Sequence, residues 1–277
     1  MTDARSILIT GASSGIGHDA ALTLKAGGWR VFATARKAED LAALTQAGCE
    51  ALYLDYTDEA SIHACADAVL AANGGKLDAL FNNGAYGQVG AIEDLTTDVL
   101  RRQFETNVFG WHTLTRRIVP IMRAQGHGRI VQCSSILGLV AGKYRGAYVG
   151  SKFALEGLTD TLRIELAGTN IHVALIEPGP IATRFTQNAL ANFHATVDVD
   201  GSAHSAEYQS QLARMKGTRR PSRFKLGPEA VTRALLHALE SPRPKVRYSV
   251  TLLTTAASVM KRFLPARVMD RLIARNS

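Results

Sequence analysis

The stretch "SILITGASSGIG", residues 6–17, joins a short apolar run to a cluster of glycines. The run predicts a strand, and Gly11, Gly15 and Gly17 follow it at the spacing G-x-x-x-G-x-G. Such glycines permit a tight turn, a close approach of backbone amides to a phosphate, and close packing of the next helix on a sheet. The stretch therefore predicts a phosphate-binding turn at the start of a helix, and a glycine turn without any ligand is the alternative.

The same alternation continues along the chain. Apolar runs that predict strands lie at 6–10, 30–35, 50–55, 77–83, 128–135 and 171–179, and stretches with helical spacing separate them. Alternating strands and helices predict βαβ units with right-handed crossovers. We therefore expect a single α/β domain over residues 1–277, with a Rossmann-type doubly wound parallel sheet and helices on both faces.

The pattern changes after the sixth predicted strand. Residues 180–226 contain no clear strand, a helix is expected over 228–240, and "KVRYSV" at 245–250 is a candidate last strand. Apolar residues spaced among arginines then predict a C-terminal helical extension. This is a basic amphipathic segment over 250–277, and Pro265 interrupts it.

Composition limits the class of protein. The chain has 277 residues, 46% of them hydrophobic and 20% charged, which suffices for one large core and argues against disorder. The three cysteines show no pairing pattern, so reduced thiols and a cytoplasmic location are expected. We expect no secretory signal, no membrane-spanning helix and no metal site, because the sequence shows none of the patterns that predict them.

The net charge of +8 is concentrated near the C-terminus. Residues 214–277 hold the whole positive excess, because residues 1–213 carry more acidic than basic side chains. No nucleic-acid motif accompanies this charge. Two interpretations of the basic segment stay open, a solvated face and a peripheral contact with an anionic membrane surface.

The second predicted strand bears on the choice of dinucleotide. An acidic residue at its tip would bind the ribose hydroxyls of NAD, but Arg36 and Lys37 stand there instead. These cations can pair with the 2′-phosphate of NADP(H), and the hydroxyl of Ser14 can add a donor. The sequence favours NADP(H) over NAD(H), and an exposed basic pair that merely begins the next helix is the alternative.

Tyr148 and Lys152 form a second candidate constellation. They lie at i and i+4 in "AYVGSK", which on a helix places them on one face. An ammonium beside a phenol lowers the pKa of the phenol, and an oxidised nicotinamide would lower it further. The phenol could then exchange a proton with a carbonyl or an alcohol, whereas the alternative is an ordinary surface pair.

Taken together, the motifs resemble those of the short-chain dehydrogenase/reductase family in order and in spacing. They cover residues 5 to about 185, and they are "TGASSGIG" at 10–17, "LDYTD" at 54–58, "NNGA" at 82–85, "FETNVFG" at 104–110, "CSS" at 133–135, "YVGSK" at 148–152 and "PGPIAT" at 178–183. The resemblance implies an NAD(P)-dependent oxidoreductase that acts on a small molecule. It also implies a homo-oligomer, either a dimer or a tetramer.

This resemblance implies a catalytic set of Asn107, Ser135, Tyr148 and Lys152. Tyr148 is the expected general acid/base, and Lys152 is expected to lower its pKa and to hold the nicotinamide ribose. Ser135, thirteen positions before the tyrosine, is expected to orient the substrate carbonyl. Asn107 is expected to position a water in a proton relay, and an amide bonded to backbone inside a helix is the alternative.

The resemblance also implies a cofactor site. Its members are Gly11, Ser13, Ser14, Gly15, Ile16, Gly17, Arg36, Lys37, Asp55, Asn82, Gly84, Tyr148, Lys152, Pro178, Gly179, Ile181 and Thr183. Asp55 corresponds to the adenine contact, and Thr183 to a hydroxyl near the nicotinamide carboxamide. The family usually has N-N-A-G where this chain has "NNGA", so the two small residues are exchanged and the conformation of that loop stays open.

The substrate side is less specified. Residues 185–226 fall where the family has its substrate lid, and the predicted substrate contacts are Ser135, Leu137, Tyr144, Tyr148 and Phe185. Apolar residues there suit a lipophilic alcohol or ketone. The runs "VFATARK" and "NNGAYG" and the basic C-terminus resemble the steroid- and retinol-dehydrogenase-like branch. The alternatives are a dinucleotide-binding sensor or scaffold without turnover, and a peripheral membrane enzyme.

Overall fold

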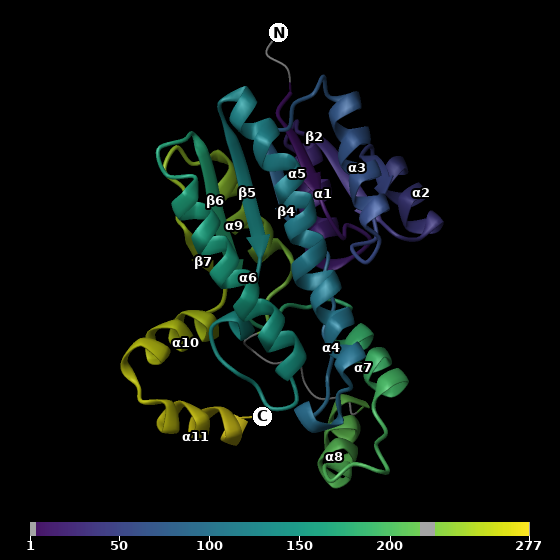
Figure 1. Cartoon of the computed structure of the whole chain (residues 1–277), viewed down its shortest axis with the longest axis vertical. Coiled ribbons are helices and arrows are strands. Elements are labelled where there is room, and N and C mark those ends of the chain that lie inside the picture. Colours follow the sequence, from purple (N-terminus) through teal and green to yellow (C-terminus); the bar gives the residue numbers. More distant parts are fainter. Residues whose placement is uncertain (1–3, 217–224, 277) are drawn as a thin grey trace.

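One parallel β-sheet organises the computed structural model, which describes residues 4–216 and 225–276 (Figure 1). Within these residues the sheet has seven strands in the order β3-β2-β1-β4-β5-β6-β7. The strands are β1 (Ser6–Ile9), β2 (Arg30–Ala35), β3 (Glu50–Tyr53), β4 (Ala79–Asn82), β5 (Gly128–Cys133), β6 (Ile171–Glu177) and β7 (Arg247–Ser249). The direction of winding reverses between β1 and β4, and in such sheets ligands bind beyond the carboxyl ends of the strands at that point.

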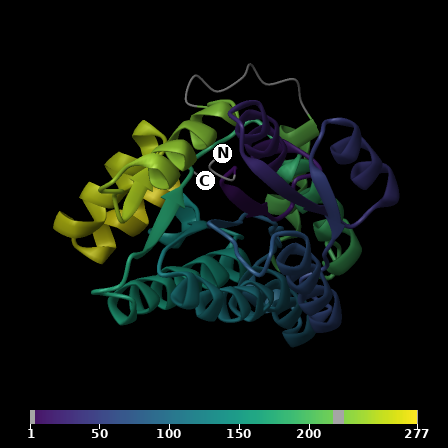
Figure 2. The ribbon, with the colours of Figure 1, turned by 90° about the horizontal axis from the view of Figure 1, so that it is seen from above.

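Helices cover both faces of the sheet, as Figure 2 shows. On one face lie α1 (Gly15–Ala26), α2 (Ala38–Gln46) and α9 (Glu229–Glu240). On the other face lie α3 (Glu59–Ala72), α5 (Gly110–Gln125) and α6 (Gly146–Glu165). A further helix, α4 (Thr97–Phe104), joins α5 through a π-helical turn over Glu105–Phe109, and 3-10 turns occupy Ile92–Asp94 and Ile136–Gly138.

The hydrophobic core lies between the sheet and its two helical layers. All residues of β1 and β4 are buried, which explains why both strands read as continuous rather than alternating apolar runs. Polar bonds join the strand ends inside this core. The buried hydroxyl of Tyr56 donates to the side-chain oxygen of Asn82 at 2.7 Å and is hydrogen-bonded to the hydroxyl of Thr10 at 2.8 Å, so the ends of β1 and β4 are held together.

Two helices, α7 (Phe185–Thr196) and α8 (Ser205–Lys216), extend beyond the carboxyl edge of the sheet (Figure 1). They contribute to a second, smaller hydrophobic cluster that also contains residues from the loops before α4 and α6. Its buried members are Val89, Ala91, Tyr144, Ala189, Phe193, Val197 and Tyr208. The predicted lid over 185–226 includes these helices, and its residues 217–224 lie outside the described residues.

Backbone hydrogen bonds close this segment at its base. The amide of Ala182 donates to the carbonyl of Leu226 at 2.8 Å, and the amide of Leu226 donates to the carbonyl of Pro180 at 3.1 Å. An isolated parallel bridge between Ile181 and Leu226 accompanies these bonds. The chain therefore leaves the sheet and returns to it at the same point.

The C-terminal segment consists of α10 (Leu252–Phe263) and α11 (Ala266–Asn276), with the predicted break at Pro265 between them. Among the described residues, no helix is both long and apolar enough to cross a membrane. The predicted α/β architecture, the parallel doubly wound sheet and the helical extension are confirmed. The predicted strands 77–83 and 171–179 are longer than the observed strands: β4 begins two residues later and ends one residue earlier than predicted, and β6 ends two residues earlier.

Candidate active site

The glycine turn after β1 depends on the absence of side chains. Gly11 and Gly15 have φ angles of +65° and +59°, which other residues rarely adopt. A Cβ atom on Gly11 would lie 2.4 Å from the Cα atom of Gly84, and one on Gly17 would lie 2.4 Å from the carbonyl oxygen of Gly11. The predicted reasons for these glycines, a tight turn and close packing of the following helix, are therefore visible in the structure.

The start of α1 is arranged to receive an anion. Ser14 is the N-cap residue, but its side chain makes no capping hydrogen bond, and the first turn of the helix contains no acidic residue. Free backbone amides and the partial positive charge of a helix N-terminus favour phosphate oxygens. Ser13 is exposed and Ile16 is half-buried in the same turn.

Thr10 organises the loop after β4, and the sequence analysis did not single it out. Its hydroxyl oxygen accepts hydrogen bonds from the amides of Asn83 at 2.9 Å and Gly84 at 3.1 Å. Neither Gly84 nor Ala85 has a positive φ angle, so neither position of the exchanged pair requires a glycine for its backbone conformation. A Cβ atom on Gly84 would instead lie 3.3 Å from the ring of Tyr56, which makes a small residue favourable there.

The predicted adenosine contacts lie at the ends of β2 and β3. The side chain of Arg36 is 70% exposed, and its guanidinium lies 3.7 Å from the carboxylate of Asp55. The other carboxylate oxygen of Asp55 accepts from the amide and the hydroxyl of Thr57. Lys37 immediately precedes α2, and its ammonium lies 3.5 Å from Glu39. The structure thus brings Arg36 and Asp55 together, whereas Lys37 also fits the alternative of a basic residue at a helix start.

The predicted catalytic residues converge at the carboxyl end of β5. Tyr148 lies in the first turn of α6 and Lys152 one turn later, and both side chains are buried, at 8% and 1% exposure. The ammonium of Lys152 donates to the carbonyl oxygen of Cys133 at 2.8 Å and lies 5.7 Å from the centre of the Tyr148 ring. Ser135 follows β5, and its side chain lies near enough to the phenol of Tyr148 to act on the pKa of that phenol. Tyr148 and Lys152 are therefore not an ordinary surface pair.

Burial, rather than the lysine, dominates the pKa of the tyrosine. Loss of solvation raises the pKa of Tyr148 above its ordinary value, the Cys133 thiol raises it further, and the Ser135 hydrogen bond and Arg145 act in the opposite direction. The sequence-based expectation of a lowered pKa is therefore not met by the protein chain itself. Burial lowers the pKa of Lys152 to about 8, against the opposing charges of Cys133 and Glu156.

Asn107 occupies the π-helical turn between α4 and α5, and π turns are frequent at functional sites. Its side-chain oxygen accepts from the amide of Tyr86 at 3.2 Å. Its amide group donates to the carbonyl of Tyr86 at 2.9 Å and to the hydroxyl of Ser151 at 3.2 Å. The side chain thus holds the loop after β4 against α6, as the alternative of a backbone-bonded amide expects, and a relay role stays a prediction.

The predicted nicotinamide-side contacts follow β6. The carbonyl of Pro178 accepts from the amide of Ile136, and Gly179 packs against Thr251. Ile181 belongs to the bridge at the base of the lid. The methyl group of Thr183 lies close to Gly15, since a Cβ atom on that glycine would come within 2.9 Å of it. The segment between β6 and the predicted lid therefore contacts the glycine turn.

The predicted substrate contacts divide into two groups. The ring of Phe185 lies 5.3 Å from the ring of Tyr148, and Leu137 is half-buried next to Ser135, so these residues share one site. Tyr144 lies elsewhere, because it is buried in the lid cluster and its hydroxyl contacts His204 at 3.2 Å. The structure does not bring Tyr144 to the tyrosine and lysine pair.

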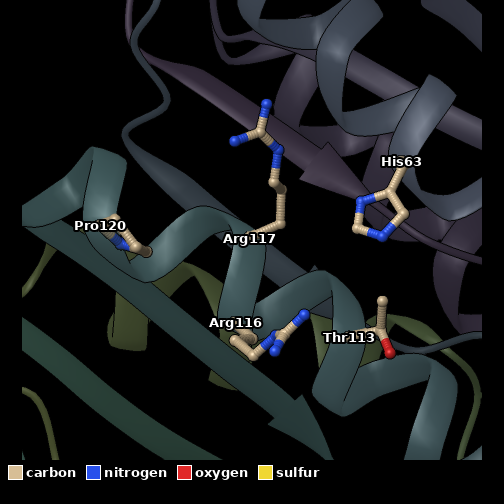
Figure 3. A pocket seen from close by; sticks show the side chains of 5 residues that line it. All are labelled: His63, Thr113, Arg116, Arg117 and Pro120. Carbon is tan, nitrogen blue, oxygen red and sulfur yellow. The ribbon is translucent and has the colours of Figure 1, made fainter.

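A surface hollow of about 220 Å³ lies between α3 and α5, away from these residues (Figure 3). His63 of α3 faces it from one side and residues of α5 from the other. The lining residues are His63, Thr113, Arg116, Arg117 and Pro120, and Arg117 bonds to Asp67 at 2.6 Å. None of the predicted site residues lines this hollow. Among the described side chains, no His, Cys, Asp and Glu cluster is arranged to hold a metal ion.

Comparisons with known proteins agree on one family. A family model described as short chain dehydrogenase matches residues 5–193. The uncharacterized oxidoreductase YbbO of Escherichia coli K12 is 42% identical over 272 residues, which cover 97% of this chain and 94% of that protein. Human retinol dehydrogenase 8 is 30% identical over 267 residues, covering 93% and 85%. Human 17-beta-hydroxysteroid dehydrogenase type 1 is 31% identical over 271 residues, covering 94% and 78%.

Solved structures share the fold over nearly the whole chain. A short-chain dehydrogenase from Streptomyces avermitilis has a TM-score of 0.79 at 32% identity, covering 99% of this chain and 96% of that one. A Burkholderia phymatum short-chain dehydrogenase/reductase in complex with NAD has a TM-score of 0.75 at 27% identity, covering 93% and 92%. Actinorhodin polyketide ketoreductase with NADPH has a TM-score of 0.72 at 28% identity, covering 90% and 96%.

These relatives and the family model cover both the glycine turn and the helix that carries Tyr148. The similarity to retinol and steroid dehydrogenases matches the branch that the sequence motifs indicate. The chain belongs to the short-chain dehydrogenase/reductase family, and within it to the branch that resembles steroid and retinol dehydrogenases.

Proposed function

We propose that the protein is an NADP(H)-dependent oxidoreductase that interconverts a carbonyl and a secondary alcohol on a lipophilic substrate. The observation that carries the proposal is the meeting of Ser135, Tyr148 and Lys152 at the carboxyl edge of the sheet. The family is one of NAD(P)-dependent oxidoreductases, so the coarse activity follows from membership. The choice of NADP(H), the substrate class and the residue roles are the proposed part.

The residues at the strand ends fit a dinucleotide. The glycine turn would hold the pyrophosphate, because its backbone is not covered by side chains. The hydroxyl of Ser14, which makes no capping hydrogen bond, would donate to the same group. Arg36 is exposed at the tip of β2 and would pair with a 2′-phosphate. In the absence of that phosphate, its partner is Asp55. Because NAD and NADPH both occur among the similar solved structures, the preference for NADP(H) rests on Arg36 and Lys37.

The protein residues handle the proton in this mechanism. When bound, the nicotinamide supplies or accepts the hydride. In the reducing direction Tyr148 gives its phenolic proton to the carbonyl oxygen, and its burial keeps the phenol protonated until that moment. The hydroxyl of Ser135 donates to the same oxygen and stabilises the charge that develops on it. Lys152, whose pKa lies near 8, returns a proton to the tyrosine.

The substrate side favours an apolar molecule such as a steroid, a retinoid or a lipophilic ketone. The ring of Phe185 lies tilted beside the ring of Tyr148, and the half-buried Leu137 follows Ser135 by two positions. The names of two relatives, retinol dehydrogenase 8 and 17-beta-hydroxysteroid dehydrogenase type 1, point to the same substrate class. The lid over 185–226 is the segment that we expect to select among such substrates.

The test is a pair of measurements on Tyr148→Phe. We expect turnover with NADPH and a panel of lipophilic ketones to fall by at least 10³-fold, while NADPH binding, followed by fluorescence titration, changes less than about threefold. Ser134→Ala is the matched control, because this neighbouring hydroxyl does not hydrogen-bond to Tyr148 among the described contacts. Equal turnover in Tyr148→Phe and wild type would exclude the proposed acid.

The cofactor preference has a separate test. Arg36→Ala should weaken NADPH binding by about 10- to 100-fold and leave NADH binding within about threefold, since only NADPH carries the 2′-phosphate.

A dinucleotide sensor without turnover is not favoured, because the proposed catalytic residues lie together and the relatives are oxidoreductases. We also propose a cytoplasmic location, which the three buried, unpaired thiols support. We further propose that the protein is a homo-oligomer, and size-exclusion chromatography with light scattering would test this assembly.

A peripheral membrane contact through the C-terminal segment is a second proposal. Leu252, Val259 and Phe263 are 82%, 54% and 75% exposed along one side of α10, and basic residues accompany them on α10 and α11. Flotation with phosphatidylserine vesicles would test it. Binding that the combined substitution of Lys261, Arg262, Arg267 and Arg271 by alanine abolishes supports the contact, and binding that survives truncation at residue 250 opposes it.

A further inference from the structure

Trp111, at the start of α5, lies between two parts of the candidate site. Its indole is fully buried, and its N–H donates to the carbonyl oxygen of Gly84 at 2.8 Å. The ammonium of Lys152 lies over its ring, 4.4 Å from the centre. One rigid side chain therefore contacts the loop after β4, which belongs to the predicted adenosine side, and the catalytic lysine.

The ammonium needs such a partner because water does not reach it. Lys152 is 1% exposed and has three N–H donors. Within the described part of the chain, its hydrogen-bond acceptor is the carbonyl of Cys133 at 2.8 Å. An aromatic face within about 6 Å attracts a cation electrostatically, tryptophan does so most strongly, and the attraction grows when the cation is desolvated. The indole face is thus the second contact that compensates this buried charge.

Other titratable groups also face Lys152 and act on its pKa. Glu156 and Tyr148 lie one turn away on either side along α6, and the thiol of Cys133 faces it from β5. From α5 the facing group is Trp111, which carries no net charge. A change confined to the indole ring leaves the titratable neighbours in place, so its effect on the lysine can be isolated.

We propose that Trp111 is a positioning residue of the active site, whose indole face seats the ammonium of Lys152 and whose N–H fixes that seat to the loop at Gly84. The inference rests on the proposed function for its catalytic meaning, because the lysine is the group that returns a proton to Tyr148. Its physical content, an electrostatic contact between ring and ammonium, does not depend on turnover.

The seat has a measurable consequence for the lysine. An aromatic face favours the charged form, whereas burial disfavours it and lowers the pKa of Lys152 to about 8. Weakening the ring's negative potential should therefore lower the pKa further. From the usual strength of cation–π contacts, complete loss of the ring face should lower the pKa of Lys152 by roughly one unit.

Fluorinated tryptophan provides the test, because fluorine withdraws electron density from the ring face while the shape and the N–H stay nearly unchanged. The sequence contains two tryptophans, so the experiment uses Trp29→Phe, in which Trp111 alone incorporates the analogue. The probe is the pH titration of the Lys152 side chain by NMR, with ¹³C at Cε and the signal identified by its loss in Lys152→Arg. We expect the titration midpoint to fall stepwise with 5-fluoro- and 5,7-difluorotryptophan, by about half a unit or more in total.

The matched control is Trp111→Phe, in which only Trp29 is fluorinated, and its lysine titration should be unaffected by the analogue. An unchanged midpoint in the folded, fluorinated Trp29→Phe protein would overturn the proposal. In a turnover assay of ketone reduction, the high-pH limb of kcat/KM should move to lower pH by the same amount. A merely structural role of Trp111 would lower the rate without moving that limb.

These two readouts separate the failure of the inference from the failure of the proposed function. If wild-type protein reduces no carbonyl with NADPH, the proposed function fails, and the NMR titration still decides whether the indole seats the ammonium. If turnover is present and the titration does not respond to fluorine, the function stands and the seat is refuted.

Discussion

Arg247 of β7 binds two carboxylates of α6 and one of β6, and replacing it should destabilise the fold. Its guanidinium bonds to Glu156, to Glu177 at 2.6 Å and to Asp160 at 2.5 Å. The side chains of Glu177 and Glu156 are 1% and 9% exposed, so neither carboxylate can turn to water. Arg247→Met keeps the apolar stem, removes the charge, and leaves two buried carboxylates without their cation.

The magnitude follows from this burial. Removing one partner of a buried ion pair costs about 3–5 kcal/mol, because the other charge stays desolvated. The side chain of Arg247 is itself 32% exposed, so water can screen part of the cluster and the lower end applies. We therefore expect a loss of about 3 kcal/mol in the free energy of unfolding at pH 7.5. In a domain of this size, that corresponds to a fall in Tm of roughly 6–12 °C.

The assay is urea unfolding at several pH values, with Arg101→Met as the matched control. Arg101 pairs with Asp98 on α4, but the two side chains are 68% and 82% exposed, so its loss should cost less than about 1 kcal/mol. The same substitution in two settings separates the buried charge from the general effect of an arginine-to-methionine change.

The pH dependence supplies a second check. Burial raises the pKa of Glu156 in the folded protein, and Arg247 is one of the groups that lower it. A carboxyl with a raised pKa binds its proton more tightly when folded, so its penalty is full at neutral pH and disappears as the pH falls through that pKa. The loss in free energy of unfolding caused by Arg247→Met should therefore become smaller as the pH falls from 7.5 to 5. A deficit no larger than that of Arg101→Met, or one that grows on acidification, would refute the reasoning.

Three further substitutions test the site and the lid. Gly15→Ala should abolish measurable NADPH binding in a fluorescence titration, because the new methyl group meets Thr183, whereas Gly28→Ala, also at a positive φ but with open space around it, should bind normally. Tyr208→Phe removes a hydroxyl that bonds to Asp94 and should lower stability by about 1–2 kcal/mol in urea unfolding, with faster proteolysis within α7 and α8. Gly87→Ala pushes against the ring at the start of α7, so KM for lipophilic ketones should change severalfold while NADPH binding does not.

Much of the fold was predictable because its signals are local. Short apolar runs predict the buried strands, and the alternation of strand and helix allows few topologies other than a doubly wound sheet. The break at Pro265 likewise follows from a residue that cannot continue a helix. The ends of β4 and β6 were less predictable, because the residue pattern does not show at which residue the chain turns out of the sheet.

The candidate site was predictable where residues sit close in sequence, as with Tyr148 and Lys152. The contacts that connect distant segments were not. Trp111 reads as an ordinary core residue, and only the structure shows its ring under the lysine. Tyr144 follows the catalytic serine by nine positions, yet its loop turns it into the lid cluster. The direction of the tyrosine pKa shift also depends on burial, which a spacing pattern does not report.

The hydrogen bonds between Ala182, Leu226 and Pro180 give the lid a narrow neck. A segment whose two ends meet can change length and composition with little effect on the sheet, since the entropy of closing a loop grows only slowly with its length. The segment between residues 182 and 226 can therefore be exchanged as a unit. Transplanting the corresponding stretch of a relative onto this neck should exchange substrate preference while the nucleotide-binding half keeps its own stability.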